Sequence, residues 1–344
     1  MKYKSQLLTI ENENIWDRYV EASNASIYHY SKWKHLIKSV FGHDSYYLYV
    51  ENDEGNVCGV LPLVHMQSFL FGSFLVSMPY FNYGGVIADN EEVEQELISK
   101  ARKLCAELKC THVELRHDKD ISSKLPCRED KVTMLLKLPE TAEELSKAIG
   151  SKRRSQIKRP IREGAEFKIG GEELLNDFYK VFSVNMRDLG TPVYSKKFFK
   201  SILMEFGENC KISVVTINGE PVSAGFLILH NKIMEIPWAS TLRKVNKFGV
   251  NMFLYWNILK SAIEMNVDVF DFGRSSKDAG TLKFKKQWGG ESKQLYWHYL
   301  LTDGEEMPVL NHSNKKYEMM ISAWQKLPVV VSNTLGPHII KGIP

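Results

Sequence analysis

Hydrophobic and polar residues along the first third of the chain follow a helical period and then an extended one. Apolar residues recur at three-to-four spacing from Trp33 to Val40, which predicts an amphipathic helix. Strands are expected over Tyr46 to Val50 and Val57 to His65, then a long helix over Glu91 to Lys109. An alternating apolar stretch from His112 to Arg116 predicts a closing strand.

The same order of elements returns in the second half of the chain. A helix is expected from Phe198 to Phe206, and strands from Lys211 to Ile217 and from Val222 to His230. A long helix over Asn251 to Asn266 and a strand over Val267 to Phe272 complete the block. Two strands, a helix and a strand in each block predict a mixed α/β sheet.

Local motifs support an internal repeat. Tyr30-Ser31-Lys32 returns as Tyr194-Ser195-Lys196, just before the two short helices. Tight hairpin turns are expected at Asn52 to Asn56 and at Asn218 to Pro221, because Asn and Gly tolerate positive φ. One matching block can arise by chance, but a shared order of several elements favours duplication.

The joint between the halves is expected near residues 139–170. We predict an N-terminal subdomain over 1–140, a C-terminal subdomain carrying the site over 141–300, and a helical tail over 301–344. Thr141 is a good N-cap, with Glu144 in the capping-box position. The apolar helical spacing in the tail predicts packing against the body, with a peripheral membrane contact as the alternative.

A basic segment follows this cap. Five of the nine residues from Ser151 to Arg159 are Lys or Arg. The segment is either a solvated helix face or a docking surface for a phosphate-rich substrate. Aromatic residues are not interleaved with the charges, so the pattern does not support stacking on single-stranded nucleic acid.

Composition narrows the class of protein. A net charge of +4, with 44% hydrophobic and 25% charged residues, is typical of a soluble globular protein. The five cysteines form no CxxC pair, so we expect reduced thiols and no zinc site. Met1 to Ile10 lacks the apolar core of a signal peptide, which indicates a cytoplasmic protein. Histidines are scattered, and no metal or triad pattern appears.

The segment from Val269 to Gly290 holds the densest pattern of chemistry. A buried strand is expected to open into a Gly/Ser loop that carries Arg274 and Lys277. Ligands usually lie in such loops, where backbone N–H groups and basic side chains neutralise an anion. Upstream, the turn at Phe248 to Asn251 precedes a helix and is a weaker phosphate-binding candidate, since it lacks the glycine spacing of the usual coenzyme A loop.

Several motifs recur in a fixed order along the second half of the chain: Trp238-Ala239-Ser240, Asn251, Tyr255-Trp256, Ala262, Phe270-Asp271-Phe272-Gly273 and Phe284-Lys285-Lys286-Gln287-Trp288-Gly289. This order resembles the FemAB family of peptidyltransferases, and especially the FemAB-like proteins that accompany exosortase and exopolysaccharide systems. The basic helix from Lys152 to Arg162, followed by Gly164, is similar to the family as well.

The resemblance implies two tandem acetyltransferase-like (GNAT) subdomains. Studied members transfer an amino acid from aminoacyl-tRNA to an amine of a peptidoglycan precursor, with a Phe-Lys pair matching Phe284-Lys285 near the tetrahedral centre. This chain lacks the long charged heptads of the staphylococcal coiled-coil arm. Acyl-CoA and aminoacyl-tRNA therefore both stand as donors, neither bound tightly.

The residues themselves are compatible with acyl transfer. The ammonium of Lys285 can stabilise an oxyanion, although an ordinary surface lysine is the plain alternative. Asp271 is either a proton acceptor or a strand-end cap. Arg187 can grip a carboxylate or phosphate, or simply pair with Asp188. The remaining candidate substrate-binding residues are Tyr194, Trp238, Ser240, Asn251, Tyr255, Arg274 and Lys277.

Three functions follow as hypotheses. The first is a transferase that moves an acyl or aminoacyl group onto a small-molecule or lipid-linked amine of a cell-envelope or polysaccharide precursor. The second is an acetyl-CoA-dependent N-acetyltransferase. The third is a non-enzymatic envelope-assembly or RNA-binding protein, because a fold does not fix a function.

Overall fold

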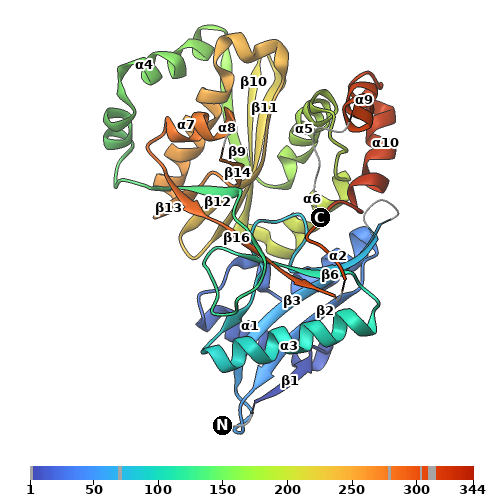
Figure 1. Ribbon diagram of the computed structural model, residues 1–344. Coiled ribbons are helices and arrows are strands. Elements are labelled where there is room, and N and C mark those ends of the chain that lie inside the picture. The colour runs from blue at the N-terminus through green and yellow to red at the C-terminus, as the bar shows by residue number, and fades with distance from the viewer. Residues whose placement is uncertain (1–2, 69–71, 278–279, 303, 309–314) are drawn as a thin grey trace. The chain divides into compact units, whose positions relative to one another are not determined.

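The chain forms two compact units. In the computed structural model, the described residues are 3–68, 72–277, 280–302, 304–308 and 315–344 (Figure 1). Unit 1 comprises Met1–Val132, Gln294–Leu310 and Lys341–Pro344, and unit 2 comprises Thr133–Lys293 and Asn311–Ile340. Each unit is built on its own mixed sheet of eight strands.

The sheet of unit 1 has the order β1-β2-β3-β4-β6-β16-β7, with β5 beside β3. Most neighbours are antiparallel, but β4 and β6 run parallel. The strands are β1 (Lys4–Leu7), β2 (Ser45–Glu51), β3 (Val57–Ser68), β4 (Gly72–Val76), β5 (Ile87–Ala88), β6 (His112–His117), β7 (Cys127–Arg128) and β16 (Tyr296–Leu301). The helices are α1 (Glu13–Ala22), α2 (Lys32–Phe41) and α3 (Glu91–Glu107).

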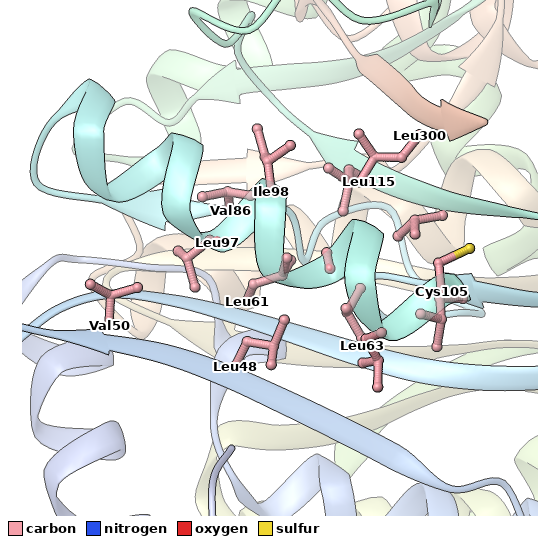
Figure 2. Packing of buried hydrophobic residues seen from close by; sticks show 14 of the residues in the cluster. Leu48, Val50, Leu61, Leu63, Val86, Leu97, Ile98, Cys105, Leu115 and Leu300 are labelled. Atoms are coloured by element: carbon pink, nitrogen blue, oxygen red, sulfur yellow. The ribbon is translucent and has the colours of Figure 1, made fainter. Parts of the chain in front are cut away.

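Helix α3 supplies the core on one face of this sheet. Its apolar stripe includes Leu97, Ile98 and Cys105, all buried in the core that α3 forms with β2, β3 and β6 (Figure 2). The helix begins where the Asn90 side chain accepts a hydrogen bond from the Val93 amide. At Gly59 on β3 an added Cβ would lie 2.5 Å from Val93 Cγ1, so the glycine permits the close approach of helix and strand.

The sheet of unit 2 has the order β14-β8-β13-β12-β11-β10-β9, with β15 beside β8. Its strands are β8 (Lys131–Lys137), β9 (Ala165–Gly170), β10 (Cys210–Ile217), β11 (Glu220–His230), β12 (Ile233–Thr241), β13 (Val269–Asp271), β14 (Ser275–Ser276) and β15 (Glu291–Gln294). Its helices are α4 (Ala142–Arg162), α5 (Leu175–Leu189), α6 (Lys196–Phe206), α7 (Val250–Glu264), α8 (Gly280–Lys286), α9 (Lys315–Gln325) and α10 (Val329–Ile340).

An aromatic core fills unit 2 on the side of α5 and α6. Phe178, Phe199, Phe226 and Trp238 contact one another edge to face, with ring centroids between 4.9 and 5.7 Å apart. Tyr194 lies against the same cluster, with its ring 6.0 Å from that of Trp238. Trp238 is thereby a core residue as well as a candidate site residue.

The predicted mixed α/β fold is confirmed, including the two repeated blocks. The sequence reasoning missed β4 and β12, the third strand of each block. It also placed 141–300 in one contiguous subdomain, whereas β16 belongs to the sheet of unit 1. Residues that pair across distant parts of the chain leave no local signal of which sheet they join.

The C-terminal tail divides between the two units. Helices α9 and α10 pack against α5, and residues 341–344 belong to unit 1. This packing against the body is the arrangement expected of the tail. Among the described residues, no helix is both long enough and apolar enough to cross a membrane.

Candidate functional site

Lys285 lies in the interior of unit 2. It is 8% exposed, and its ammonium donates hydrogen bonds to the carbonyl oxygens of Gly273 at 2.6 Å and Arg274 at 3.0 Å. Those carbonyls belong to the loop between β13 and β14, so α8 and this loop are joined through the lysine. The side chain does not extend into bulk solvent, which excludes the alternative of an ordinary surface lysine.

Two buried carboxylates accompany this ammonium. Glu235 on β12 and Asp271 on β13 occupy opposite positions in the parallel ladder. Burial lowers the pKa of Lys285 to about 8, although the charges of Asp271 and Glu235 act to raise it. At neutral pH the lysine is therefore mainly charged, yet its pKa lies near the working pH.

Asp271 is also the cap of its own strand. Its Oδ1 accepts hydrogen bonds from the Gly273 amide at 2.8 Å and from the Thr133 hydroxyl at 2.5 Å. These bonds give the carboxylate the structural role that we held open as an alternative.

The lysine lies where two parallel strands part. Strands β12 and β13 pair only from Ile233 opposite Val269 to Glu235 opposite Asp271. Beyond that point β12 continues to Thr241 beside β11, while the chain after Asp271 turns away into the loop. A position at the carboxyl end of parallel strands is where α/β sheets commonly bind ligands.

Aromatic rings shield this end of the sheet. Tyr255 of α7 stacks on Phe272 with centroids 5.7 Å apart, and Phe284 meets Tyr255 edge to face at 5.1 Å. Trp288 lies within 6.4 Å of Phe284 and is buried, as expected for a core residue. Phe284 thus packs beside the lysine as part of a hydrophobic wall, which lowers the local dielectric.

Two buried donors near the lysine have no hydrogen-bond partner among the described residues. They are the Ser275 hydroxyl, one residue beyond the carbonyl of Arg274, and the indole N–H of Trp288. An unsatisfied buried donor costs about 1–3 kcal/mol, so such groups commonly await a ligand or water.

The N-terminus of α7 adjoins the free end of β12. Gly249 caps the helix with φ +79°, and an added Cβ would lie 3.3 Å from the carbonyl oxygen of Gln156. Asn251 accepts a hydrogen bond from Thr241 at 3.3 Å, and Ser240 accepts one from Asn185 at 3.1 Å. These polar side chains hold the strand end beside a helix terminus that can receive an anion.

The candidate acceptor-binding residues form a separate group around α5. Arg187 donates to Asp188 at 2.7 Å and to the carbonyl oxygen of Leu327 at 2.8 Å. This is the plain Arg–Asp pair that we held open, and it occupies part of the guanidinium. Tyr194 lies against Trp238 in the aromatic core.

Arg274 and Lys277 are exposed on the loop that follows β13. Residues 278–279 of this loop lie outside the described residues. The two cations lie in the same loop as the carbonyl oxygens of Gly273 and Arg274 that bind Lys285. Their charges favour the approach of an anionic substrate.

The basic segment of α4 is exposed on one side. Gly150 breaks the helix with φ 80° and ψ 167°, and Ile157 and Pro160 face inward while Lys158 and Arg159 are exposed. A groove of about 450 Å³ lies where α4 meets α7, lined by Ala142, Glu143, Ser146, Lys147, Arg154, Trp256 and Lys260. Of the predicted basic segment only Arg154 lines this groove, where it donates a hydrogen bond to the carbonyl oxygen of Ser146 and lies with Lys147, Lys260 and the acidic Glu143.

Sequence reasoning missed one polar member of the site, Glu235. It occupies a buried strand among apolar residues, from Ile233 to Ile236, and a lone carboxylate in such a strand was the available signal. Among the described residues, no group of three or more His, Cys, Asp or Glu side chains could hold a metal ion. All five cysteines lie in the described residues and are free thiols.

Comparisons with known proteins agree with this architecture. Residues 151–286 match the family described as Acetyltransferase (GNAT) domain. A search of curated proteins finds no match. Among solved structures, FemX aligns over 86% of this chain and 97% of its own, with a TM-score of 0.65 and 13% identity.

Two further structures share the fold. A tandem GNAT protein from the clavulanic acid biosynthesis pathway aligns over 89% of this chain and all of its own (100%), with a TM-score of 0.57 and 9% identity. L-PGS from Bacillus licheniformis aligns over 91% of this chain and 96% of its own, with a TM-score of 0.54 and 13% identity. At these identities the likeness establishes the fold.

Fold and domain match together identify the GNAT fold, with residues 151–286 matching the acetyltransferase (GNAT) domain model. Two subdomains in tandem give the chain the FemAB-like architecture that the sequence resemblance implied.

Proposed function

We propose that the protein transfers an activated acyl or aminoacyl group onto an amine of a cell-envelope or polysaccharide precursor, in the cytoplasm. The observation that carries the proposal is the ammonium of Lys285, held by two backbone carbonyls at the parting of β12 and β13. A fixed cation in a dry site is suited to stabilise charge that develops during a reaction.

The proposed reaction is the attack of an amine on an activated acyl group. The amine nitrogen attacks the acyl carbonyl carbon, a C–N bond forms, and the carbonyl oxygen becomes an oxyanion stabilised by Lys285. Collapse of the intermediate breaks the bond to the carrier, which leaves as a thiolate or alkoxide. The proton lost by the amine passes to a base, for which Glu235, Asp271 or a substrate group are the candidates, and from there to the leaving group.

The donor is either an acyl-CoA or an aminoacyl-tRNA. The GNAT family match and the N-terminus of α7 at Gly249 support an acyl-CoA donor, which corresponds to the acetyl-CoA-dependent alternative. The basic face of α4 and the sequence resemblance to the FemAB family support an aminoacyl-tRNA donor. A genuine donor will protect the protein against thermal unfolding, because it binds the folded state.

The acceptor is a small or lipid-linked amine. The structural neighbours FemX and L-PGS support a peptidoglycan precursor or a lipid, and the sequence resemblance adds exopolysaccharide precursors. Arg187 and Tyr194 on the α5 side are the proposed contacts for its anionic part.

Mass spectrometry of candidate acceptors is the direct test. The purified protein is incubated with each amine and with either acyl-CoA or charged tRNA, and we expect a mass increase equal to one acyl or aminoacyl group with one donor class. Should neither donor modify any acceptor or raise the melting temperature, while Lys285→Ala and Arg187→Ala leave the biological activity intact, the non-enzymatic hypothesis would prevail.

Activity is expected to depend on pH through Lys285. Its pKa of about 8 means that the ammonium is present below that pH and is lost above it. Under saturating substrate the transfer rate should therefore fall as pH rises through about 8, until it is roughly tenfold lower one unit further on. A pH–rate profile measures this limb, and Lys285→Arg should remove it, because arginine stays charged.

Stability provides an independent check of the same group. Between pH 8 and 10.5 the unfolded chain binds a proton at this lysine that the folded chain has lost. The contribution of Lys285 therefore makes the folded protein more stable as pH rises across this window. A transfer rate that stays constant up to pH 10 would contradict the assignment of a pKa near 8 to Lys285.

A further inference from the structure

Two cysteines of unit 1 lie together where α3 ends. The turn after the helix places Lys109 at a positive φ of 53°, and the Cys110 amide donates a hydrogen bond back to the carbonyl oxygen of Cys105 at 2.9 Å. The Lys109 amide donates to the carbonyl oxygen of Ala106 at 3.1 Å. These two backbone bonds form a Schellman motif, which commonly brings the side chains of its first and last residues into contact.

The two sulfur atoms are in contact as a result. The thiols of Cys105 and Cys110 hydrogen-bond to each other, and Cys105 Sγ also lies 3.5 Å from the carbonyl oxygen of Cys110. They are 2% and 4% exposed, at the edge of the core between α3 and the sheet (Figure 2). The exposed Lys109 precedes Cys110, and a helix end of this kind opens locally at low cost, so a small solute can reach the sulfurs.

A serine and a histidine adjoin the pair on the side of the sheet. The Ser73 hydroxyl of β4 lies 3.5 Å from Cys110 Sγ and 2.8 Å from His65 Nε2 of β3. Burial lowers the pKa of His65, so this imidazole is neutral at pH 7 and can accept a proton through the serine. The three side chains therefore form a continuous path along which the proton of the Cys110 thiol can leave.

These contacts make the two thiols chemically unequal. The hydrogen bond from Cys105 lowers the pKa of Cys110 to about 7, although burial opposes the shift, and the hydrogen bond with Ser73 acts in the same direction. The bond between the thiols and burial raise the pKa of Cys105 far above its usual range. Cys110 is thus the nucleophilic thiolate, while Cys105 keeps its proton.

We propose that Cys105 and Cys110 form an oxidation site for hydrogen peroxide, which converts the pair to a disulfide. The Cys110 thiolate attacks one peroxide oxygen, the O–O bond breaks, and the released hydroxide takes up the thiol proton to form water. The Cys105 sulfur then attacks the sulfenic sulfur of Cys110, the S–O bond breaks, and hydroxide leaves with the Cys105 proton as a second water. Each sulfur is oxidised by one electron, and the peroxide is reduced by two.

Peptide mapping after peroxide treatment tests the inference. Trypsin cleaves after Lys103, Lys109 and Arg116, so the two cysteines fall on separate peptides, 104–109 and 110–116. The reduced full-length protein is treated with hydrogen peroxide, catalase stops the reaction, and N-ethylmaleimide in urea blocks every remaining thiol. We expect the two peptides to be joined, and to separate when a reductant is added.

Two other cysteines serve as matched controls. Cys127 is more exposed than the pair, but burial raises its pKa to about 11. Cys210 is buried in unit 2, and this burial raises its pKa to about 12. Both should stay reduced while the pair is oxidised, because the thiolate is the form that reacts. Oxidation of Cys127 as fast as Cys110 would overturn the inference, and so would a pair that stays reduced in the folded wild-type protein.

Variants separate the roles of the two thiols. In Cys105→Ser, oxidation of Cys110 should stop at an oxygen adduct, whereas in Cys110→Ser the Cys105 thiol should stay reduced. Ser73→Ala should slow the loss of the Cys110 thiol about fivefold, because one hydrogen bond to the thiolate is removed. Unchanged melting temperatures would show that the variants fold. Loss of the Cys105 thiol at the wild-type rate in Cys110→Ser would contradict the assigned roles.

Discussion

Replacing Lys285 by methionine is expected to lower the acyl-transfer rate by about 10²- to 10³-fold, the loss typical when one preorganised oxyanion donor is removed. Methionine keeps much of the side-chain volume but cannot donate to the carbonyl oxygens of Gly273 and Arg274. The effect should appear in kcat more than in KM, because the interaction strengthens as the oxyanion forms. Single-turnover kinetics with the donor identified by mass spectrometry would measure it.

The adjacent residue provides the control. Lys286 belongs to the same helix, carries the same charge and is exposed, so Lys286→Met should change the rate by less than about twofold. If both substitutions lowered the rate equally, the charge of the helix rather than the buried ammonium would be responsible. If Lys285→Met kept full activity in a folded protein, the proposed role of the lysine would be wrong.

The second large effect is expected on stability, in unit 1. Arg116 is 1% exposed, and its guanidinium contacts the Glu114 carboxylate at 2.7 Å, the carbonyl oxygen of Phe81 at 2.8 Å and the Trp297 ring at 4.4 Å. The Tyr299 hydroxyl donates to the same carboxylate at 2.8 Å. Glu114→Leu would leave a buried cation without its partner and should lower the free energy of unfolding by about 3–5 kcal/mol.

Urea unfolding measures this loss, and a double variant tests its cause. Adding Arg116→Met to Glu114→Leu removes the orphaned charge and should recover much of the stability. An exposed ion pair gives the contrast: Lys38 and Asp44 are 2.6 Å apart but more than half exposed, so Asp44→Ala should cost less than about 1 kcal/mol. A loss below 1 kcal/mol for Glu114→Leu would contradict the assignment.

The contribution of the Glu114–Arg116 pair to stability depends on pH through Glu114. Burial acts to raise the pKa of Glu114, but the charge of Arg116 and the hydrogen bonds from Tyr299 and Arg116 outweigh it and lower the pKa. The folded state therefore binds this proton less readily than the unfolded state. The contribution of Glu114 to stability is present above the ordinary glutamate pKa and is lost as pH falls through the folded value.

Elements with a strong local pattern were predictable from the sequence. The hairpin at Asn218 and Gly219 adopts the positive φ values expected of these residues, 52° and 77°. Thr141 caps α4 by accepting a hydrogen bond from the Glu144 amide, as predicted. Both signals reside in a few neighbouring residues, so tertiary context does not alter them.

The pairing of distant segments and the burial of single polar side chains could not be predicted from the sequence. The short strand β13 offered no sign that residues 131–137 would pair beside it, since register is decided by contacts far along the chain. The burial of Lys285 likewise depends on Gly273 and Arg274, which fold back from another element. A basic run such as Leu282 to Lys286 looks the same in sequence whether its lysines are solvated or enclosed.

The exchange of strands between the halves of the chain restricts how the protein can be divided. The sheet that begins with β1 is completed by β16, from the far end of the second half, which lies between β6 and β7. A fragment ending near residue 140 would lack β16, so the edges of β6 and β7 that pair with it would be unpaired. Unpaired strand edges promote aggregation. The first half of the chain is thus not a self-sufficient module, because a strand from the other half completes its sheet.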